Sequence, residues 1–99
     1  MRALYDSEAH AMYIDVVDPP HDGPRGTDAD GYPVNVDVDS GERIVGVEIL
    51  DADDTPDDQV VAVLARFGLD AVGILAARDA ALRAPDREVT LTVGASLAA

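Results

Sequence analysis

The stretch IVGVEIL at residues 44–50 decides the fold of this chain, because only Gly46 and Glu48 interrupt its apolar run. A strand that is apolar on both faces is typical of the middle of a sheet, where other elements cover it. We therefore expect a central strand here. Gly46 predicts a place where a neighbouring backbone or side chain comes close. Glu48 is expected to face solvent or to bond a fixed partner, such as Arg43 or a tyrosine hydroxyl.

Three more strands are predicted before this stretch. In residues 32–39 valines alternate with polar side chains, which is the period of a half-buried strand, and residues 39–42 (DSGE) provide the turn into the central strand. Residues 2–5 and 12–17 predict two strands that pair as an antiparallel hairpin across the turn at residues 6–9.

Residues 18–31 are predicted to be a loop. They contain three prolines and three glycines with aspartates between them, and no apolar side chain larger than that of Ala29. Such a composition cannot offset the entropy lost on ordering. We therefore expect a mobile excursion without regular structure, and a tolerated insertion is favoured over a functional loop.

The period of the apolar residues becomes helical after residue 54. Thr55 is the predicted cap of a helix, Pro56 its first helical residue, and the aspartates that follow suit the positive end of the helix dipole. Gly68 is placed to end this helix. Its apolar stripe is expected to consist of Val60, Val61, Leu64 and Phe67.

A second helix and a last strand complete the predicted fold. The helix is expected over residues 70–83, ended by the Pro-Asp pair that follows, and the strand over residues 88–93; the tail from residue 94 is expected to fray. The apolar side of the second helix is expected to consist of Ile74, Leu75 and Leu82. The resulting order ββββααβ predicts an α+β fold, a small antiparallel sheet with two helices packed on one face.

Composition places the chain among small acidic proteins. Its 99 residues predict a single domain, and 20 Asp and Glu against seven Arg give a formal charge of −13. This charge disfavours direct nucleic-acid binding and docking on an anionic membrane. It suits a basic protein partner, but it also keeps a small protein soluble, and solubility is the favoured interpretation. The absence of cysteine excludes thiolate catalysis. No segment has the pattern of a signal peptide or membrane span, so a cytoplasmic location is expected.

Residues 5–14 (YDSEAHAMYI) and 36–52 (VDVDSGERIVGVEILDA) form two motifs in the first half of the chain. Together they resemble a small bacterial family called domain of unknown function 2283, and the resemblance covers about residues 1–52. His10 stands where the family usually has Asp, and the loop at residues 18–31 is longer than usual. Residues 53–99 form an unmatched helix–helix–strand extension. The resemblance implies no established activity, and it implies an antitoxin-like role because some relatives occur beside toxin-like proteins.

Two patterns could indicate a metal site, and both are interpreted as structural. Asp37, Gly41 and Glu48 approach the spacing of a calcium loop, but the glycine comes one place early and a carboxylate is missing. A turn between strands is therefore favoured. His10 and His21 are the only histidines, one in a turn and one in the loop, and a structural or incidental role is favoured for both.

Two further groups could carry acid–base or nucleophilic chemistry. The carboxylates before and within the first helical turn could raise one another's pKa, but a solvated acidic patch is favoured for Asp51, Asp53, Asp54, Asp57 and Asp58. The serines lack a His/Asp relay and a nucleophile-elbow context; these are Ser7, Ser40 and Ser96. We predict no catalytic, cofactor-binding or metal-binding residue, and no enzyme.

The leading hypothesis is an acidic, protein-binding module, antitoxin-like and self-associating as a dimer, with a basic protein as its partner. The first alternative is a nucleic-acid mimic that inhibits a basic protein, and it requires carboxylates in two rows along one face. The second is a small-ligand or metal-binding domain, which requires a pocket with convergent polar groups.

Overall fold

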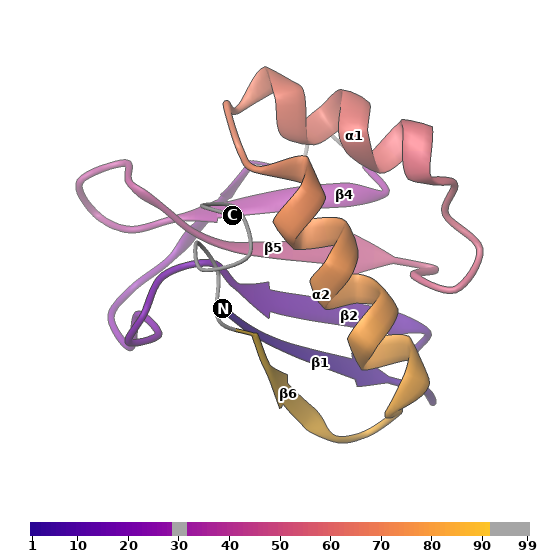
Figure 1. Ribbon diagram of the computed structural model, residues 1–99. Coiled ribbons are helices and arrows are strands. Elements are labelled where there is room, and N and C mark those ends of the chain that lie inside the picture. Colours follow the sequence, from indigo (N-terminus) through magenta and orange to yellow (C-terminus); the bar gives the residue numbers. More distant parts are fainter. Residues whose placement is uncertain (29–31, 92–99) are drawn as a thin grey trace, which may run out of the picture.

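Alternating apolar and polar residues build an antiparallel sheet in the computed structural model, which describes residues 1–28 and 32–91 (Figure 1). The described strands are β1 (Arg2–Asp6), β2 (Ala11–Asp15), β3 (Gly26–Asp28), β4 (Val34–Val38), β5 (Ile44–Leu50) and β6 (Glu88–Thr90). Their order across the sheet is β3-β4-β5-β2-β1-β6. The predicted α+β class is thus confirmed.

Strand β5 lies between β4 and β2, so the central position predicted for residues 44–50 is confirmed. The register places Val47 of β5 between Val36 of β4 and Ile14 of β2. All three side chains are fully buried. Branched aliphatic side chains on neighbouring strands pack well on a pleated surface, and this row joins the two hairpins, β1–β2 and β4–β5, into one sheet.

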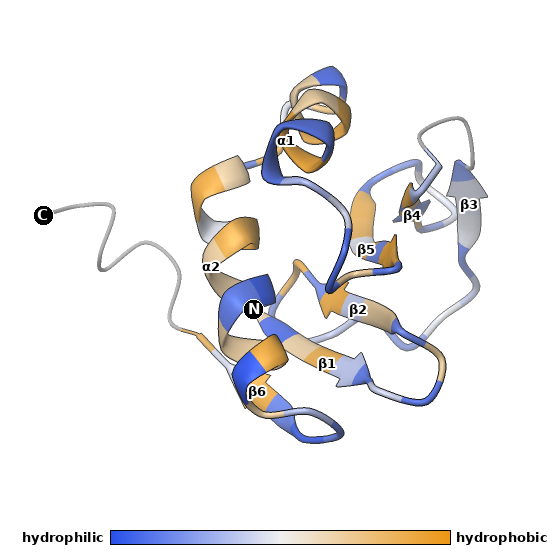
Figure 2. Ribbon diagram, turned by 90° about the vertical axis from the view of Figure 1, so that its right-hand side faces the viewer, coloured by the Kyte–Doolittle hydropathy of each residue, from blue (hydrophilic) through white to orange (hydrophobic). Residues whose placement is uncertain are grey.

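Helices α1 (Asp57–Arg66) and α2 (Ala71–Arg83) lie together on one side of the sheet (Figure 2). Helix α2 packs over β1, β2 and β6, and α1 packs against α2. Apolar side chains of both layers form the core, among them Met12, Ile14, Ile49, Leu64 and Ile74. No helix in the described part of the chain is long and apolar enough to cross a membrane.

The start of α1 differs from its prediction. Pro56 occupies the cap position and its side chain makes no capping bond, whereas Thr55 is buried and its hydroxyl donates to the carbonyl oxygens of Leu50 at 2.8 Å and Asp51 at 2.9 Å. Thr55 therefore ties the helix start to the end of β5. The inward stripe contains Val63 in place of Val61, because Val61 is 37 % exposed.

The end of α1 and both ends of α2 confirm their predictions. Gly68 has a φ of 68° directly after α1, the left-handed conformation that glycine adopts without strain. The Asp70 side chain caps α2 by accepting from the backbone N–H of Gly73 at 3.2 Å. Within α2, Arg78 is only 6 % exposed and donates to the Thr55 carbonyl oxygen at 2.8 Å and to Asp57, so a buried guanidinium joins the two helices.

Strand β3 corrects two predictions. Residues 26–28 were expected to belong to an irregular loop, but they pair antiparallel with β4, Thr27 opposite Asp37. The element order is therefore βββββααβ, with five strands before the helices. The sequence did not predict β3 because this three-residue edge strand forms through its backbone hydrogen bonds to β4. Its residues, Gly-Thr-Asp, have no alternation of apolar and polar side chains that would indicate a strand.

The last strand lies at the other edge of the sheet. Strand β6 pairs antiparallel with β1, Val89 opposite Ala3, so the helical extension returns a strand to the first hairpin. Met1 and Leu91 exchange backbone bonds of 2.9 Å and 3.2 Å beyond the end of this pairing. Residues 92–93 of the predicted strand and the tail from residue 94 lie outside the described residues.

Candidate binding face of the sheet

The sheet face that carries no helix is lined by polar side chains, and we call it the helix-free face. Alternation along each strand directs these side chains away from the core. The register brings them side by side on the four inner strands: Arg2 and Leu4 from β1, Tyr13 and Asp15 from β2, Gly46 and Glu48 from β5, Asn35 and Asp37 from β4.

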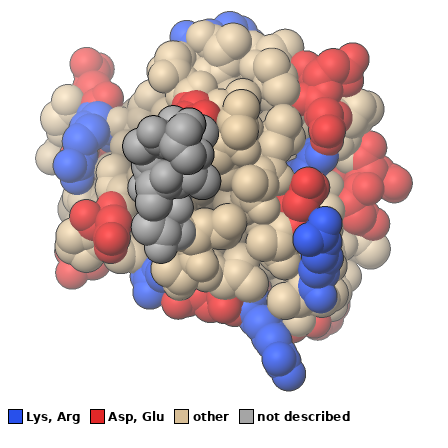
Figure 3. All heavy atoms as spheres, in the orientation of Figure 1, with Lys and Arg blue, Asp and Glu red and all other residues tan. Residues whose placement is uncertain are grey.

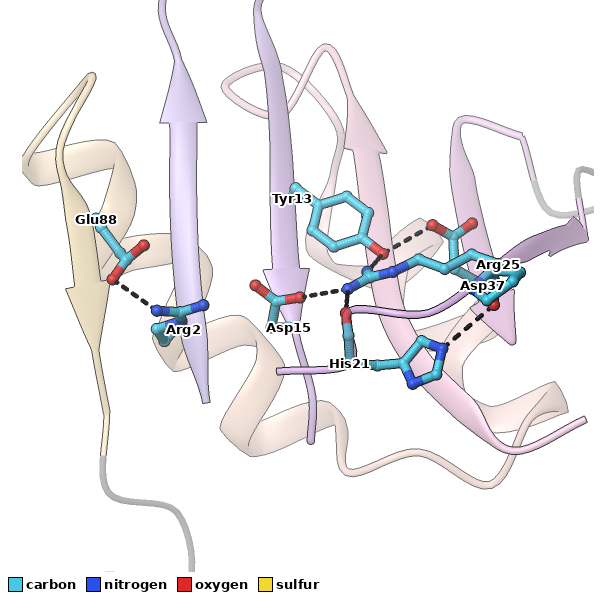
Figure 4. A network of polar contacts seen from close by, with 8 residues as sticks. Arg2, Tyr13, Asp15, His21, Arg25, Asp37 and Glu88 are labelled. Atoms are coloured by element: carbon cyan, nitrogen blue, oxygen red, sulfur yellow. Dashed lines mark hydrogen bonds and ion pairs between the residues drawn. The ribbon is translucent and has the colours of Figure 1, made fainter. Parts of the chain in front are cut away.

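Tyr13 lies across β5 at Gly46 (Figure 4). Its hydroxyl donates to Asp37 Oδ2 on β4 at 2.7 Å. A Cβ atom at position 46 would overlap this hydroxyl, so only glycine allows the ring to cross the central strand. The close approach predicted at Gly46 is thus confirmed, and the ring covers the second face of β5.

The side chain of Arg25 lies on the Tyr13 ring, with its guanidinium carbon 5.3 Å from the ring centre. It donates to the Tyr13 hydroxyl and to the carbonyl oxygen of His21, and it lies 3.4 Å from Asp15 Oδ1 (Figure 4). The side chains of Arg25 and Asp15 are only 25 % and 20 % exposed. A guanidinium thus occupies a site built from an aromatic face, a carboxylate, a hydroxyl and a carbonyl.

Asp37 is held from two sides. It accepts from the Tyr13 hydroxyl and, at 2.7 Å, from the Thr27 hydroxyl of β3. Burial raises the pKa of Tyr13 to about 12, with the Asp37 hydrogen bond as the next largest cause. Tyr13 therefore remains protonated at neutral pH, and its hydroxyl can relay a hydrogen bond from Arg25 to Asp37.

Glu48 and Asn35 form a second polar pair on this face. Asn35 Nδ2 donates to Glu48 Oε1 at 3.2 Å, and the Asn35 side-chain oxygen is buried without a hydrogen-bond partner in the described part of the chain. Glu48 therefore bonds a fixed partner, which was one of its two expected arrangements. The partner is Asn35, however, and neither Arg43 nor a tyrosine hydroxyl.

The two histidines lie in separate places. His10 precedes β2, with Nδ1 at 3.4 Å from the Tyr5 hydroxyl and 3.6 Å from Asp53 Oδ2. His21 follows β2, and its Nε2 lies 3.2 Å from the carbonyl oxygen of Pro24. The structure does not bring them together, and each has a local contact that accounts for its position.

The calcium-like spacing belongs to a hairpin, as favoured. Asp37 lies in β4, Glu48 in β5, and Gly41 in the turn between these strands. The turn is organised by Asp39, whose Oδ1 accepts from the backbone N–H groups of Gly41 and Arg43, each at 2.9 Å. Within residues 1–28 and 32–91, no group of three or more His, Asp or Glu side chains is arranged to hold a metal ion.

The predicted acidic patch and two of the three serines lie at the surface. Asp51, Asp53, Asp54, Asp57 and Asp58 are all exposed along the β5–α1 loop and the first turn of α1. Ser7 donates its hydroxyl to Asp86 Oδ2 at 2.6 Å, Ser40 is exposed in the β4–β5 turn, and Ser96 lies outside the described residues.

A cavity of about 350 Å³ opens at the end of the sheet where β1 begins and β2 ends. Its lining includes the charged side chains of Arg2 and Asp18 and the apolar side chains of Val16 and Leu91. This cavity is the place where the small-ligand hypothesis can be tested.

Sequence reasoning singled out Asp37, Gly46 and Glu48 but missed Tyr13, Arg25 and Asn35. Tyr13 falls within the predicted strand over residues 12–17, and Arg25 within the predicted loop over residues 18–31. A signal was present in the glycine of an otherwise apolar strand, since such a glycine predicts a large side chain above it. Which side chain this would be depends on strand pairing.

Residues 2–52 match the family model described as Protein of unknown function (DUF2283). This segment contains β1 to β5 and therefore the whole Tyr13–Arg25–Asp37 arrangement. The chain has no significant match among curated proteins or among solved structures.

Proposed function

We propose that this chain, which belongs to the DUF2283 family of proteins of unknown function, is a non-catalytic binding module for a basic protein. An antitoxin-like role, in which the partner is a basic toxin of similar size, is the biological setting that we propose for it, in the cytoplasm. The proposal excludes direct binding of nucleic acid and docking on an anionic membrane, because the charge of the chain repels both.

The observation that carries this proposal is the distribution of charge on the folded surface. The chain has 20 Asp and Glu but only seven Arg, and one of these arginines, Arg78, is buried between the helices. Acidic side chains gather at the side of the molecule where the β5–α1 loop lies (Figure 3). A surface with this excess steers a positively charged partner and accelerates association at low salt.

The polar groups of the helix-free face support binding in preference to catalysis. The Tyr13 hydroxyl has a pKa of about 12, too far above neutrality for efficient proton transfer. Asp37 accepts from two hydroxyl donors, and Ser7 donates directly to the carboxylate of Asp86 without a histidine between them.

Self-association as a dimer is the second part of the proposal. The described edge strands β3 and β6 have three residues each, and short edges provide few backbone groups for pairing. We therefore propose that a dimer forms through side-chain surfaces, with Leu4 at 43 % exposed on the helix-free face as one apolar contact. Light scattering across a tenfold or wider concentration range tests this part, and a monomer throughout contradicts it.

The test of the main proposal is binding to the product of a neighbouring basic gene, measured by calorimetry at two salt concentrations. We expect a complex that weakens steeply with salt. Neutralising Asp53, Asp54 and Asp58 together to asparagine should weaken it, because long-range attraction depends on this patch. No binding, or binding indifferent to salt and to these substitutions, contradicts the proposal. Displacement of the partner by DNA would identify the chain as a nucleic-acid mimic.

A further inference from the structure

We propose that the helix-free face contains a binding site for an arginine side chain of the basic partner, and that Arg25 of the chain itself occupies this site in the free protein. This inference rests on the proposed function, because it names the group by which the partner is recognised. Arg25 is then an internal competitor that the partner must displace.

The site is recognisable from its present occupant. The Arg25 guanidinium stacks at 5.3 Å from the centre of the Tyr13 ring and contacts Asp15, the Tyr13 hydroxyl and a backbone carbonyl. A planar guanidinium uses an aromatic face and several acceptors at once, whereas an ammonium ion uses them poorly. The site therefore favours arginine over lysine.

Two of the contacts belong to the rigid part of the molecule. Tyr13 and Asp15 lie in β2, next to the central strand, and the Tyr13 ring is fixed by Gly46 below it and by Asp37 beyond it. These groups keep their positions whether or not Arg25 is present. A preorganised site of this kind loses little entropy when a new guanidinium enters.

Arg25 is attached to the sheet by a weakly held segment. In the described part of the chain, residues 17–25 make no backbone hydrogen bond to the sheet, and regular pairing resumes only at the three-residue β3. The side chain of Arg25 links this segment to β2 through Tyr13 and Asp15. Segments with few backbone bonds and few buried apolar groups open at low free-energy cost.

The charge of the face would still attract a cation after Arg25 has left. Asp15, Asp37 and Glu48 lie in two adjacent rows of the inner strands, and Arg25 is the cation in contact with Asp15. Asn35, only 8 % exposed, adds a side-chain oxygen without a partner in the described residues. Such an unused acceptor is unusual for a buried side chain. It lies beside Glu48 on β5, the strand that separates Asn35 from Tyr13.

The experiment uses two blocked tripeptides, acetyl-Gly-Arg-Gly-amide and acetyl-Gly-Lys-Gly-amide, titrated into the ¹⁵N-labelled full chain and followed by NMR. For wild type we expect weak binding, because the tethered Arg25 competes. Arg25→Ala should bind the arginine peptide about tenfold more tightly, since removing a competitor raises the fraction of competent protein. The largest shifts are expected at the amides of Tyr13, Asp15 and Asp37.

Two further variants separate the site from general charge. Arg25→Lys keeps the net charge but loses the planar fork, so it should still bind the arginine peptide several-fold more tightly than wild type. Arg66→Ala, at the exposed end of α1 on the other side of the sheet, removes one charge and should leave peptide binding unchanged. Asp15→Asn added to Arg25→Ala should abolish the gain.

Three outcomes would overturn the inference: equal gains in Arg25→Ala and Arg66→Ala, equal binding of both peptides, or shifts confined to the β5–α1 loop. These outcomes leave the proposed function standing if the basic partner still binds the wild-type chain. Failure of the partner to bind, with the peptide results as expected, would instead contradict the proposed function alone.

Discussion

The two faces of the sheet are built from neighbouring residues of the same strands but by different interactions. On the helix-covered face, Ile14, Val47 and Ile49 are fully buried beneath α1 and α2. On the helix-free face, Tyr13 and Asp15 from the same β2 strand take part in hydrogen bonds and an ion pair. The first face derives its stability from apolar area, and the second has a defined arrangement that is available for recognition.

Because the two faces are built differently, substitutions on one face should affect stability and substitutions on the other should affect binding. Substitutions on the helix-covered face should mainly change the free energy of unfolding. Substitutions on the helix-free face should change binding more than stability. Gly46 is the exception, because a side chain at this position of the central strand would displace the Tyr13 ring.

The largest effect is expected from Ile14→Ala. This side chain is 0 % exposed between β1 and β5, and its truncation removes buried apolar contacts and leaves a cavity. We expect a loss of about 2–5 kcal/mol in the free energy of unfolding, measured by denaturant titration. Asp15→Ala, the next residue on the opposite face, is the control and should cost much less; equal losses would contradict the contrast between the faces.

A smaller effect is expected from Gly46→Ala. The added methyl group would overlap the Tyr13 ring, so the ring must leave Asp37, at a cost of about 1–3 kcal/mol. The same change in a Tyr13→Ala background should be nearly neutral, because no ring then covers position 46. Unfolding measurements on the four proteins of this cycle give the coupling, and additive effects would show that the ring does not lie there.

The third prediction concerns alkaline pH. The pKa of Tyr13 rises from 10.0 to about 12 in the folded protein, so the folded state holds this proton more tightly than the unfolded state. The corresponding stability is fully present below pH 10 and is lost as the pH rises towards 12. Tyr13→Phe should therefore lose less stability over this window. Parallel pH profiles for the two proteins would contradict the assigned environment.

The smallest effect is expected at the end of the sheet, from Ser7→Ala. The Ser7 hydroxyl and backbone N–H both donate to Asp86 and lower the pKa of this carboxyl below its ordinary value of 3.8. Such a group stabilises the fold above its unfolded pKa and loses this contribution as the pH falls. Wild type should thus destabilise slightly more than Ser7→Ala on acidification below pH 4, as acid titration by circular dichroism would show.

Much of this architecture was predictable because local patterns agree with the tertiary fold. The apolar run at residues 44–50 predicted the central strand, the valine alternation predicted β4, and Gly68 and Asp70 predicted the boundary between the helices. Each of these signals depends on residues within one helix, strand or turn. Such a short-range pattern predicts local structure without knowledge of which distant residues pack against it.

The sequence by itself thus determined the fold class, the hairpins, both helices and the negative charge. Only the tertiary structure decided that β3 pairs with β4, that Thr55 bonds the end of β5 instead of capping α1, and that Tyr13 crosses Gly46 to reach Asp37. The physical reason is that these contacts join residues whose spacing along the chain carries no period. They form only when strand pairing has brought β2, β4 and β5 into one sheet, and so the candidate site was not visible in the pattern that predicted the fold.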